Sequence, residues 1–201
     1  MTVVAVRQLA PAHQASVLSL GLVAVVGARW AATIGGAAGG LTVGLLFGVA
    51  LLALAALGGR PALERNLPTA AAIGLAGGLV LVAIALLARV PMASSPVPSG
   101  GFGPAALFAP WLAITVLVAT AEELLLRGAL FRAVEAAGGL WLAVAVTTLA
   151  FALMHVPLYG WHVVPLDLGV GLWLAGLRLV SGGIVAPAVA HAIADLATWW
   201  L

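Results

Sequence analysis

Long apolar segments alternate along the chain with short breaks of glycine, proline and a few charged residues. A helix that crosses the hydrocarbon core of a bilayer needs roughly 20 mainly apolar residues. Lipid satisfies no backbone hydrogen bond, so such segments are expected to be helical. We predict seven of them, at about 15–34, 37–58, 69–90, 105–136, 140–157, 163–179 and 184–201. The predicted fold class is all-α, a polytopic transmembrane helical bundle of about seven spans.

Glycine, proline and polar residues mark the connections between these segments, because they interrupt helices and favour turns. The longer connections are predicted to be loops and the shorter ones tight turns. They lie at Gly35 to Gly40, Gly59 to Pro68, Pro91 to Pro104, Gly138 with Gly139, and Ser181 to Gly183.

The composition agrees with a protein embedded in lipid. Hydrophobic residues make up 64% of the chain, charged residues 7%, and the mean hydropathy is +1.24. Soluble domains carry about 25% charged residues, so the lipid bilayer is the expected surroundings of one compact membrane domain. A net charge of +2 is too small for a nucleic-acid-binding surface. The absence of cysteine excludes disulfides and a thiol nucleophile.

The positions of the arginines predict an orientation in the cell membrane. Cytoplasmic loops of membrane proteins carry an excess of Lys and Arg. A cytoplasmic N-terminus gives the larger excess, and with seven spans it puts the C-terminus outside. In that orientation the inside holds Arg7, Arg60, Arg65, Arg132 and Arg178, and the outside holds Arg29 and Arg89.

Ionisable residues within the apolar segments are the candidates for chemistry. Such groups are costly at membrane depth and usually face the bundle interior. Asp167 follows Pro165 at the start of a segment, so we expect it at the interface or in a hydrogen bond between helices rather than in a site. The full set is Glu122, Glu123, Arg127, His155, Asp167, His191 and Asp195.

Glu122 and Glu123 are adjacent carboxylates that would repel each other in a medium of low dielectric constant. Glu123 and Arg127 are four residues apart with the acid first, which is the favoured spacing for an ion pair on a helix. Glu122 points about 100° away around the helix. We therefore expect Glu123 to be the structural partner of Arg127 and Glu122 to be free to act as a base.

The turn at Gly138 and Gly139 predicts what Glu122 faces. Glu122 and His155 each lie sixteen residues from this turn. An antiparallel helical hairpin would place both roughly 24 Å from the turn, at the same depth. His191 and Asp195 form a second pair four residues apart, although the same counting puts His191 roughly 7–13 Å away from the depth of His155.

These residues suit hydrolysis by activated water. A carboxylate beside a neutral imidazole can deprotonate water, and a second histidine can stabilise the oxyanion on a peptide carbonyl. No serine is available as a nucleophile, since Ser181 falls in a predicted turn. The alternative is a Zn²⁺ site held by Glu122, His155 and His191, but their long separations match no short metal-binding motif. No cofactor is favoured.

The motifs resemble those of the CPBP family of intramembrane proteases, which includes the type II CAAX prenyl endopeptidases and the bacterial bacteriocin-processing and Abi proteins. Glu122 to Arg127 matches EExxxR, Phe151 to His155 matches FxxxH, and His191 to Asp195 matches HxxxN except for its last residue. The resemblance covers residues 105–201, whereas the helices of residues 1–104 carry no motif.

The resemblance implies an intramembrane endopeptidase whose site opens toward the cytoplasm. It implies that Glu122 and His155 activate water, and that His191 and position 195 stabilise the oxyanion. Ionised Asp195 cannot donate a hydrogen bond as Asn does, so it would have to be protonated or orient His191 instead. The implied substrates are peptides or proteins processed at the C-terminus, with prenylated CAAX peptides among them.

Two other functions use the same residues. Buried ionisable groups also form the proton or ion relay of a transporter, although no internal repeat of the kind found in transporters is evident. A catalytically degenerate scaffold is the other alternative. Loss of peptide cleavage in a folded Glu122→Gln variant separates the protease from both.

Overall fold

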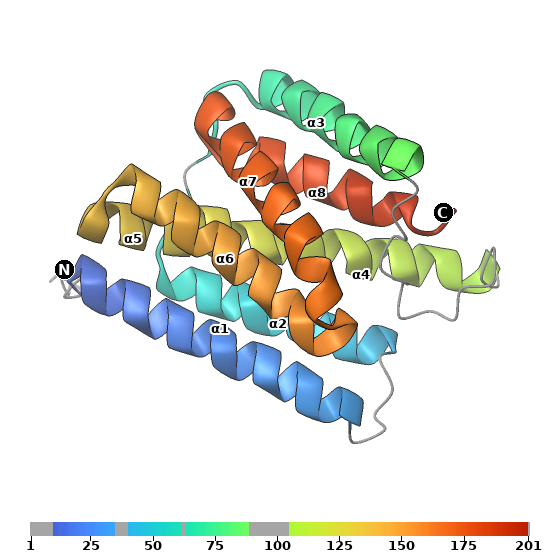
Figure 1. The fold of residues 1–201 in the computed structure, drawn as a ribbon, viewed down its shortest axis with the longest axis horizontal. Helices are drawn as coiled ribbons and strands as arrows, with labels where there is room; N and C mark the ends of the chain where they lie inside the picture. Colours follow the sequence, from blue (N-terminus) through green and yellow to red (C-terminus); the bar gives the residue numbers. More distant parts are fainter. Residues whose placement is uncertain (1–9, 35–39, 62, 89–104, 201) are drawn as a thin grey trace, which may run out of the picture.

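A computed structural model describes residues 10–34, 40–61, 63–88 and 105–200 (Figure 1). Throughout these ranges the regular structure is helical, which confirms the predicted all-α class. A π-helical segment, η1, joins α4 to α5 without a break. The elements are α1 (Pro11–Ile34), α2 (Leu41–Leu57), α3 (Leu67–Ala88), α4 (Ala105–Glu123), η1 (Leu124–Leu130), α5 (Phe131–Gly138), α6 (Leu140–Tyr159), η2 (Trp161–Val163), α7 (Val164–Ser181) and α8 (Val185–Ala197).

The seven predicted segments all form helices, but they differ in their ability to span a membrane. Five are long and apolar enough to do so by length and composition. The other two, α2 with 17 residues and α8 with 13, are shorter. A helix of 13 residues is only about 20 Å long, less than the hydrocarbon core of roughly 30 Å. α8 therefore lies within the bundle rather than crossing the whole bilayer alone.

The turns between the later helices are confirmed. Gly139 (φ 86°) separates α5 from α6, and Gly182 (φ 82°) follows α7. These left-handed backbone conformations favour glycine. Ser181 is the last residue of α7 rather than part of the turn. The predicted connections at 35–39 and 91–104, with Arg7 and Arg89, lie outside the described residues.

α3 lies beside α8 (Figure 1), and small residues allow the two helices to pack closely. A Cβ atom added at Gly74 would lie 2.5 Å from the carbonyl oxygen of Ala186, and one at Gly78 would lie 2.8 Å from Cβ of Ile193. Such contacts between backbones are typical of helices in membranes. α8 is thereby held firmly against α3.

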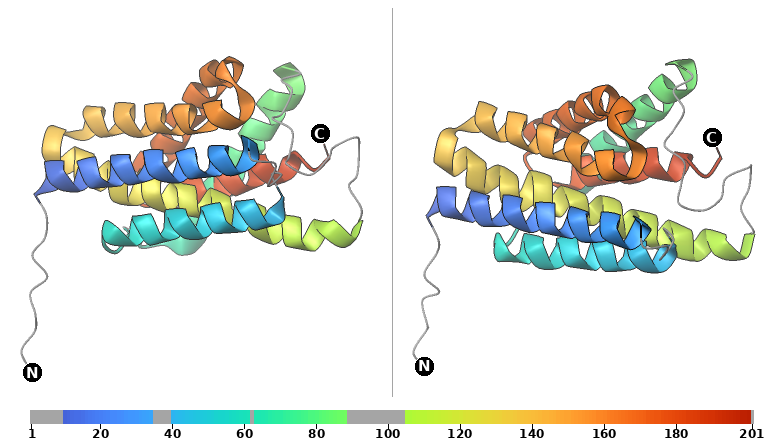
Figure 2. Two further views of the ribbon diagram at one scale, coloured as in Figure 1. Left: turned by 90° about the horizontal axis from the view of Figure 1, so that it is seen from below. Right: turned by 60° about the horizontal axis from the view of Figure 1, so that its bottom comes forward.

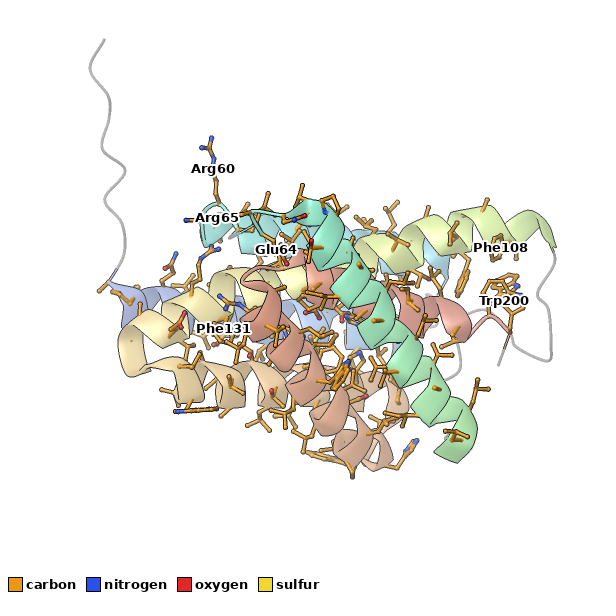
Figure 3. The ribbon with its side chains drawn as sticks, turned by 90° about the horizontal axis from the view of Figure 1, so that it is seen from above. Arg60, Glu64, Arg65, Phe108, Phe131 and Trp200 are labelled. Atoms are coloured by element: carbon orange, nitrogen blue, oxygen red, sulfur yellow. The ribbon has the colours of Figure 1, made fainter. Side chains whose placement is uncertain are left out.

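The helices define two ends of the bundle. α1 begins at the end where α5 turns into α6, and it finishes at the end where α6 turns into α7 (Figures 1 and 2). Figure 3 shows Arg60 and Arg65 at the first end, and Phe108 and Trp200 at the second. Phe108 packs edge-on against Trp199, with 5.2 Å between ring centroids. The second end therefore carries an aromatic cluster.

Candidate active site

A cavity of about 240 Å³ lies toward this aromatic end of the bundle. Its walls come from α1, α2, α3, α4, α6, α7 and α8, so the helices before residue 105 contribute as well as the later ones. Much of the wall is apolar. The ionisable residues that line it are Arg29, Glu122, His155, Tyr159, Asp167, His191 and Asp195.

The predicted ion pair between Glu123 and Arg127 is confirmed. Nη1 of Arg127 donates to Oε1 of Glu123 at 2.7 Å, and both side chains are fully buried. Nη2 of Arg127 donates to the carbonyl oxygen of Gly171 on α7 at 2.9 Å. The guanidinium also lies 4.8 Å from the centroid of the Phe151 ring on α6. This pair joins α4 and η1 to α6 and α7.

His191 lies among three carboxylates. Its Nδ1 donates to Oε1 of Glu123 at 3.0 Å. Its Nε2 lies 3.8 Å from Oε2 of Glu122 and 3.5 Å from Oδ2 of Asp195. Glu123 is therefore more than the partner of Arg127, because it also fixes the ring orientation of His191.

The predicted difference in depth does not keep His191 and His155 apart, because both line one cavity. That prediction converted residue counts into depth as if neighbouring helices were parallel. Figure 1 shows α7 crossing the bundle at a steep angle, so a residue count along it overstates the change in depth. His191 consequently reaches the same cavity as His155.

His155 and Glu122 line the same cavity. The histidine within ion-pair distance of Glu122, however, is His191. Nδ1 of His155 donates to the carbonyl oxygen of Phe151 at 2.9 Å and lies 3.6 Å from Oδ2 of Asp167. The predicted direct match assumed regular α-helix between Glu122 and the glycine turn. Seven of the intervening residues instead form η1, and a π-helical segment changes the rotation of the helix.

Asp167 makes a polar contact between helices, which is one of the two places predicted for it, and it also lines the cavity. Its side chain is only 17% exposed and faces His155. The short 3₁₀ segment η2 folds the start of α7 back toward the end of α6. Asp167, near the start of α7, is therefore brought to the cavity wall.

Residues 104–197 match the family model described as type II CAAX prenyl endopeptidase Rce1-like. This part of the chain is similar to the Rce1-like family. Neither a curated protein nor a solved structure matches the chain significantly. The family match begins beside α4 and ends with α8. It therefore contains Glu122, His155 and His191, whereas Arg29 comes from outside it.

Arg178 makes contacts that stabilise the Rce1-like region and that were not predicted from the sequence. Nε of Arg178 donates to the carbonyl oxygen of Arg127 at 2.5 Å, and its guanidinium lies 3.8 Å from the centroid of the Phe131 ring. Arg127 belongs to η1, where the regular α-helical hydrogen bonding is interrupted. The hydrophobic pattern does not distinguish such a π-helical segment from a continuous α-helix.

Glu64, in the loop before α3, is a second residue that sequence reasoning missed. Its carboxylate accepts hydrogen bonds from the backbone N–H groups of Val185 at 2.8 Å and Ala186 at 3.1 Å, and from the Ser181 hydroxyl at 3.0 Å. It therefore caps the N-terminus of α8, where a negative charge is favourable. The helix that carries His191 is thus fixed by a residue outside the Rce1-like match.

The side chains of the site do not form a ready metal centre. Among the residues that the structure describes, no three His, Asp or Glu side chains are grouped to hold a metal ion. Nδ1 of His191 and Nδ1 of His155 are both engaged in hydrogen bonds, so Nε2 is the nitrogen that each ring presents to a substrate or ligand.

The cavity and the start of α1 lie at opposite ends of the bundle. A cytoplasmic N-terminus, expected from the arginines, would make the cavity open away from the cytoplasm. The resemblance to CPBP proteases implies the reverse. These two expectations require opposite orientations of the bundle in the membrane. The first rests on the arginines of this chain, and the second rests on the resemblance.

Proposed function

We propose that this protein is an intramembrane endopeptidase in which Glu122 activates the water that attacks a peptide bond. The observation that carries the proposal is the position of Glu122, 3.8 Å from Nε2 of His191 at the wall of a largely apolar cavity. Similarity to the Rce1-like family over residues 104–197 supports a protease. The geometry supports a mechanism that uses acids and bases of the chain itself.

Glu122 is the general base. The separation of 3.8 Å between Glu122 and His191 is too long for a direct hydrogen bond and leaves room for a water held near both. Glu122 takes a proton from this water as its oxygen attacks the carbonyl carbon. The same proton then passes to the amine that leaves, which closes the cycle.

His191 stabilises the negative charge that develops on the carbonyl oxygen. Because Nδ1 donates to Glu123, Nε2 is the nitrogen that remains for the substrate, and it donates to the oxyanion from the doubly protonated ring. A donor fixed in advance acts strongly in a site that excludes water. Asp195, 3.5 Å from Nε2 and 42% exposed in its side chain, orients the imidazole from the open side of the cavity.

His155 assists from α6. Its Nδ1 bonds to the backbone of its own helix, so its Nε2 is the nitrogen available to hold the attacking water. Asp167 lies 3.6 Å from Nδ1 and helps to keep the ring in this orientation. His155 and Glu122 then share the activation of water, as the motif resemblance implies.

The substrate in this proposal is a peptide or protein that reaches the site from the bilayer and is processed near its C-terminus in the CAAX manner. The apolar part of the cavity wall, with Leu81, Ile84 and Val118, suits a prenylated or otherwise hydrophobic peptide.

The test uses the purified protein in detergent with a library of prenylated and unprenylated peptides, and mass spectrometry of the products. We expect one new cleavage near the C-terminus, unaffected by chelators. Absence of any cleavage by the folded protein would overturn the proposed function. Inhibition by a chelator that is restored by Zn²⁺ would overturn the metal-free mechanism.

A further inference from the structure

Tyr159 is a polar residue of the cavity wall that the proposed mechanism does not use. It is the last residue of α6 and lines the cavity together with His155, one helical turn earlier. The two rings are stacked, with 5.9 Å between their centroids and 24° between their planes. Gly160, with φ 88°, ends the helix, and its backbone N–H donates to the carbonyl oxygen of Val156 at 2.8 Å. The ring stack and this helix end together fix the position of the phenol.

The hydroxyl of Tyr159 is available to a ligand. Among the residues that the structure describes, it has no hydrogen-bond partner. A tyrosine hydroxyl in largely apolar surroundings usually finds a partner, because leaving it unpaired costs free energy. The charges of Glu122, Asp167 and Asp195 reach this hydroxyl, so it belongs to the polar part of the cavity.

A peptide in this cavity needs donors for its main-chain carbonyl oxygens. An ionised carboxylate accepts hydrogen bonds and cannot donate them, so the acids of the wall serve only the N–H groups of a peptide. In the proposed mechanism Nε2 of His191 donates to the scissile carbonyl. A tyrosine hydroxyl can donate as well as accept, so Tyr159 supplies a donor for a second carbonyl.

We propose that Tyr159 is a substrate-binding residue whose hydroxyl donates a hydrogen bond to a main-chain carbonyl oxygen of the peptide. This inference rests on the proposed function and names how the substrate is held. A contact with the main chain does not depend on the side chains of the peptide, so it sets the register of the peptide rather than selecting a sequence. The hydrogen bond forms with the intact peptide, so it acts on binding rather than on the chemical step.

A tyrosine at the end of a membrane helix can also serve as an interfacial anchor. An anchor stabilises the position of the helix, so its loss affects every peptide equally. Tyr159→Phe separates the two roles, because it keeps the ring and its stacking on His155 and removes only the hydroxyl oxygen.

The experiment measures dissociation constants of peptides with the Glu122→Gln variant and with the Glu122→Gln and Tyr159→Phe double variant. The probe is the tightest-binding member of the peptide library, carrying a fluorophore. Its analogues each have one amide replaced by a trans alkene, which keeps the shape of the amide and lacks the carbonyl. Trp161→Phe is the matched control, since Trp161 is 74% exposed and is not among the residues that line the cavity.

We expect Tyr159→Phe to weaken binding of the parent peptide by about 3- to 10-fold, as the loss of a neutral hydrogen bond allows. The control should change little. One alkene analogue should lose a similar factor when Tyr159 is present and lose nothing further with Tyr159→Phe, which identifies the carbonyl that accepts the hydrogen bond.

Equal binding of the parent peptide with and without the hydroxyl overturns the proposal, and so does a loss that is independent of Tyr159 at every alkene position. A control that weakens binding as much as Tyr159→Phe also overturns it. Cleavage without coupling to Tyr159 would refute this inference alone, whereas coupled binding without cleavage by the wild type would refute the proposed function alone. Absence of binding by every peptide overturns both.

Discussion

His191 and Arg127 donate hydrogen bonds to the same oxygen atom, Oε1 of Glu123, at 3.0 and 2.7 Å. One fully buried carboxylate therefore connects the helix α8 that carries His191 to the segment η1 that carries Arg127. The adjacent acid, Glu122, lines the cavity. The two neighbouring glutamates thus have different surroundings, because they point in different directions around α4.

Replacement of Glu123 by Gln is expected to destabilise the protein strongly. Arg127 would keep its charge in a buried place without its anionic partner, which costs roughly 3–5 kcal/mol. Thermal unfolding in detergent measures the loss. The matched control is Glu135→Gln on the exposed surface of α5, which should change little. A double replacement, Glu123→Gln with Arg127→Met, should recover part of the stability, and an unchanged melting temperature in the single variant would contradict this role.

Replacement of Glu64 by Gln tests the cap of α8. The neutral side chain loses the charge-assisted hydrogen bonds to Val185 and Ala186, with an expected cost of about 1–2 kcal/mol. Hydrogen exchange followed by mass spectrometry should show faster exchange at the start of α8, while the start of α6 is unchanged. Uniform exchange along the two helices would mean that Glu64 does not fix α8.

Replacement of Asp167 by Asn tests whether this residue acts through His155. The side chain keeps its size but loses the charge that faces Nδ1 of the histidine. We expect kcat to fall by about tenfold with little change in KM, because the imidazole is less well oriented for water. Asp167→Asn in a His155→Ala background should then have no additional effect. An additive loss would show that Asp167 works independently of His155.

The orientation can be measured directly because the chain has no cysteine. Trp141 lies at the start of α6 and Trp161 lies in η2, directly after the other end of α6. The two residues are 78% and 74% exposed. Since Arg60, Arg65, Arg132 and Arg178 lie at the Trp141 end, the positive-inside rule puts that end in the cytoplasm. A membrane-impermeant thiol reagent added to intact cells should label Trp161→Cys and spare Trp141→Cys. The opposite pattern would mean that the cavity opens to the cytoplasm.

The sequence predicted those features that depend on local spacing. The seven helical segments follow from apolar length, and the pair of Glu123 with Arg127 follows from a separation of four residues on one helix. Both are properties of a single element, so no knowledge of packing is required.

The remaining parts of the site depend on how distant helices cross. The contact of His191 with Glu123 and the cap formed by Glu64 on α8 each join residues more than sixty positions apart. The position of Arg29 in the cavity depends likewise on how α1 packs. The angle of α7 and the π-helical η1 leave no trace in hydropathy, so residue counts alone do not give the positions of His155 and His191.

The central claim is that Glu122 is the base that activates water, and cleavage of one peptide substrate by Glu122→Gln tests it most directly. The amide keeps the shape of the side chain but cannot accept the proton, so the account predicts a loss of kcat of about 10²- to 10⁴-fold. The melting temperature should remain close to that of the wild type, and the exposed control Glu135→Gln should retain full activity. Cleavage by folded Glu122→Gln at a rate within a few fold of the wild type would contradict the account.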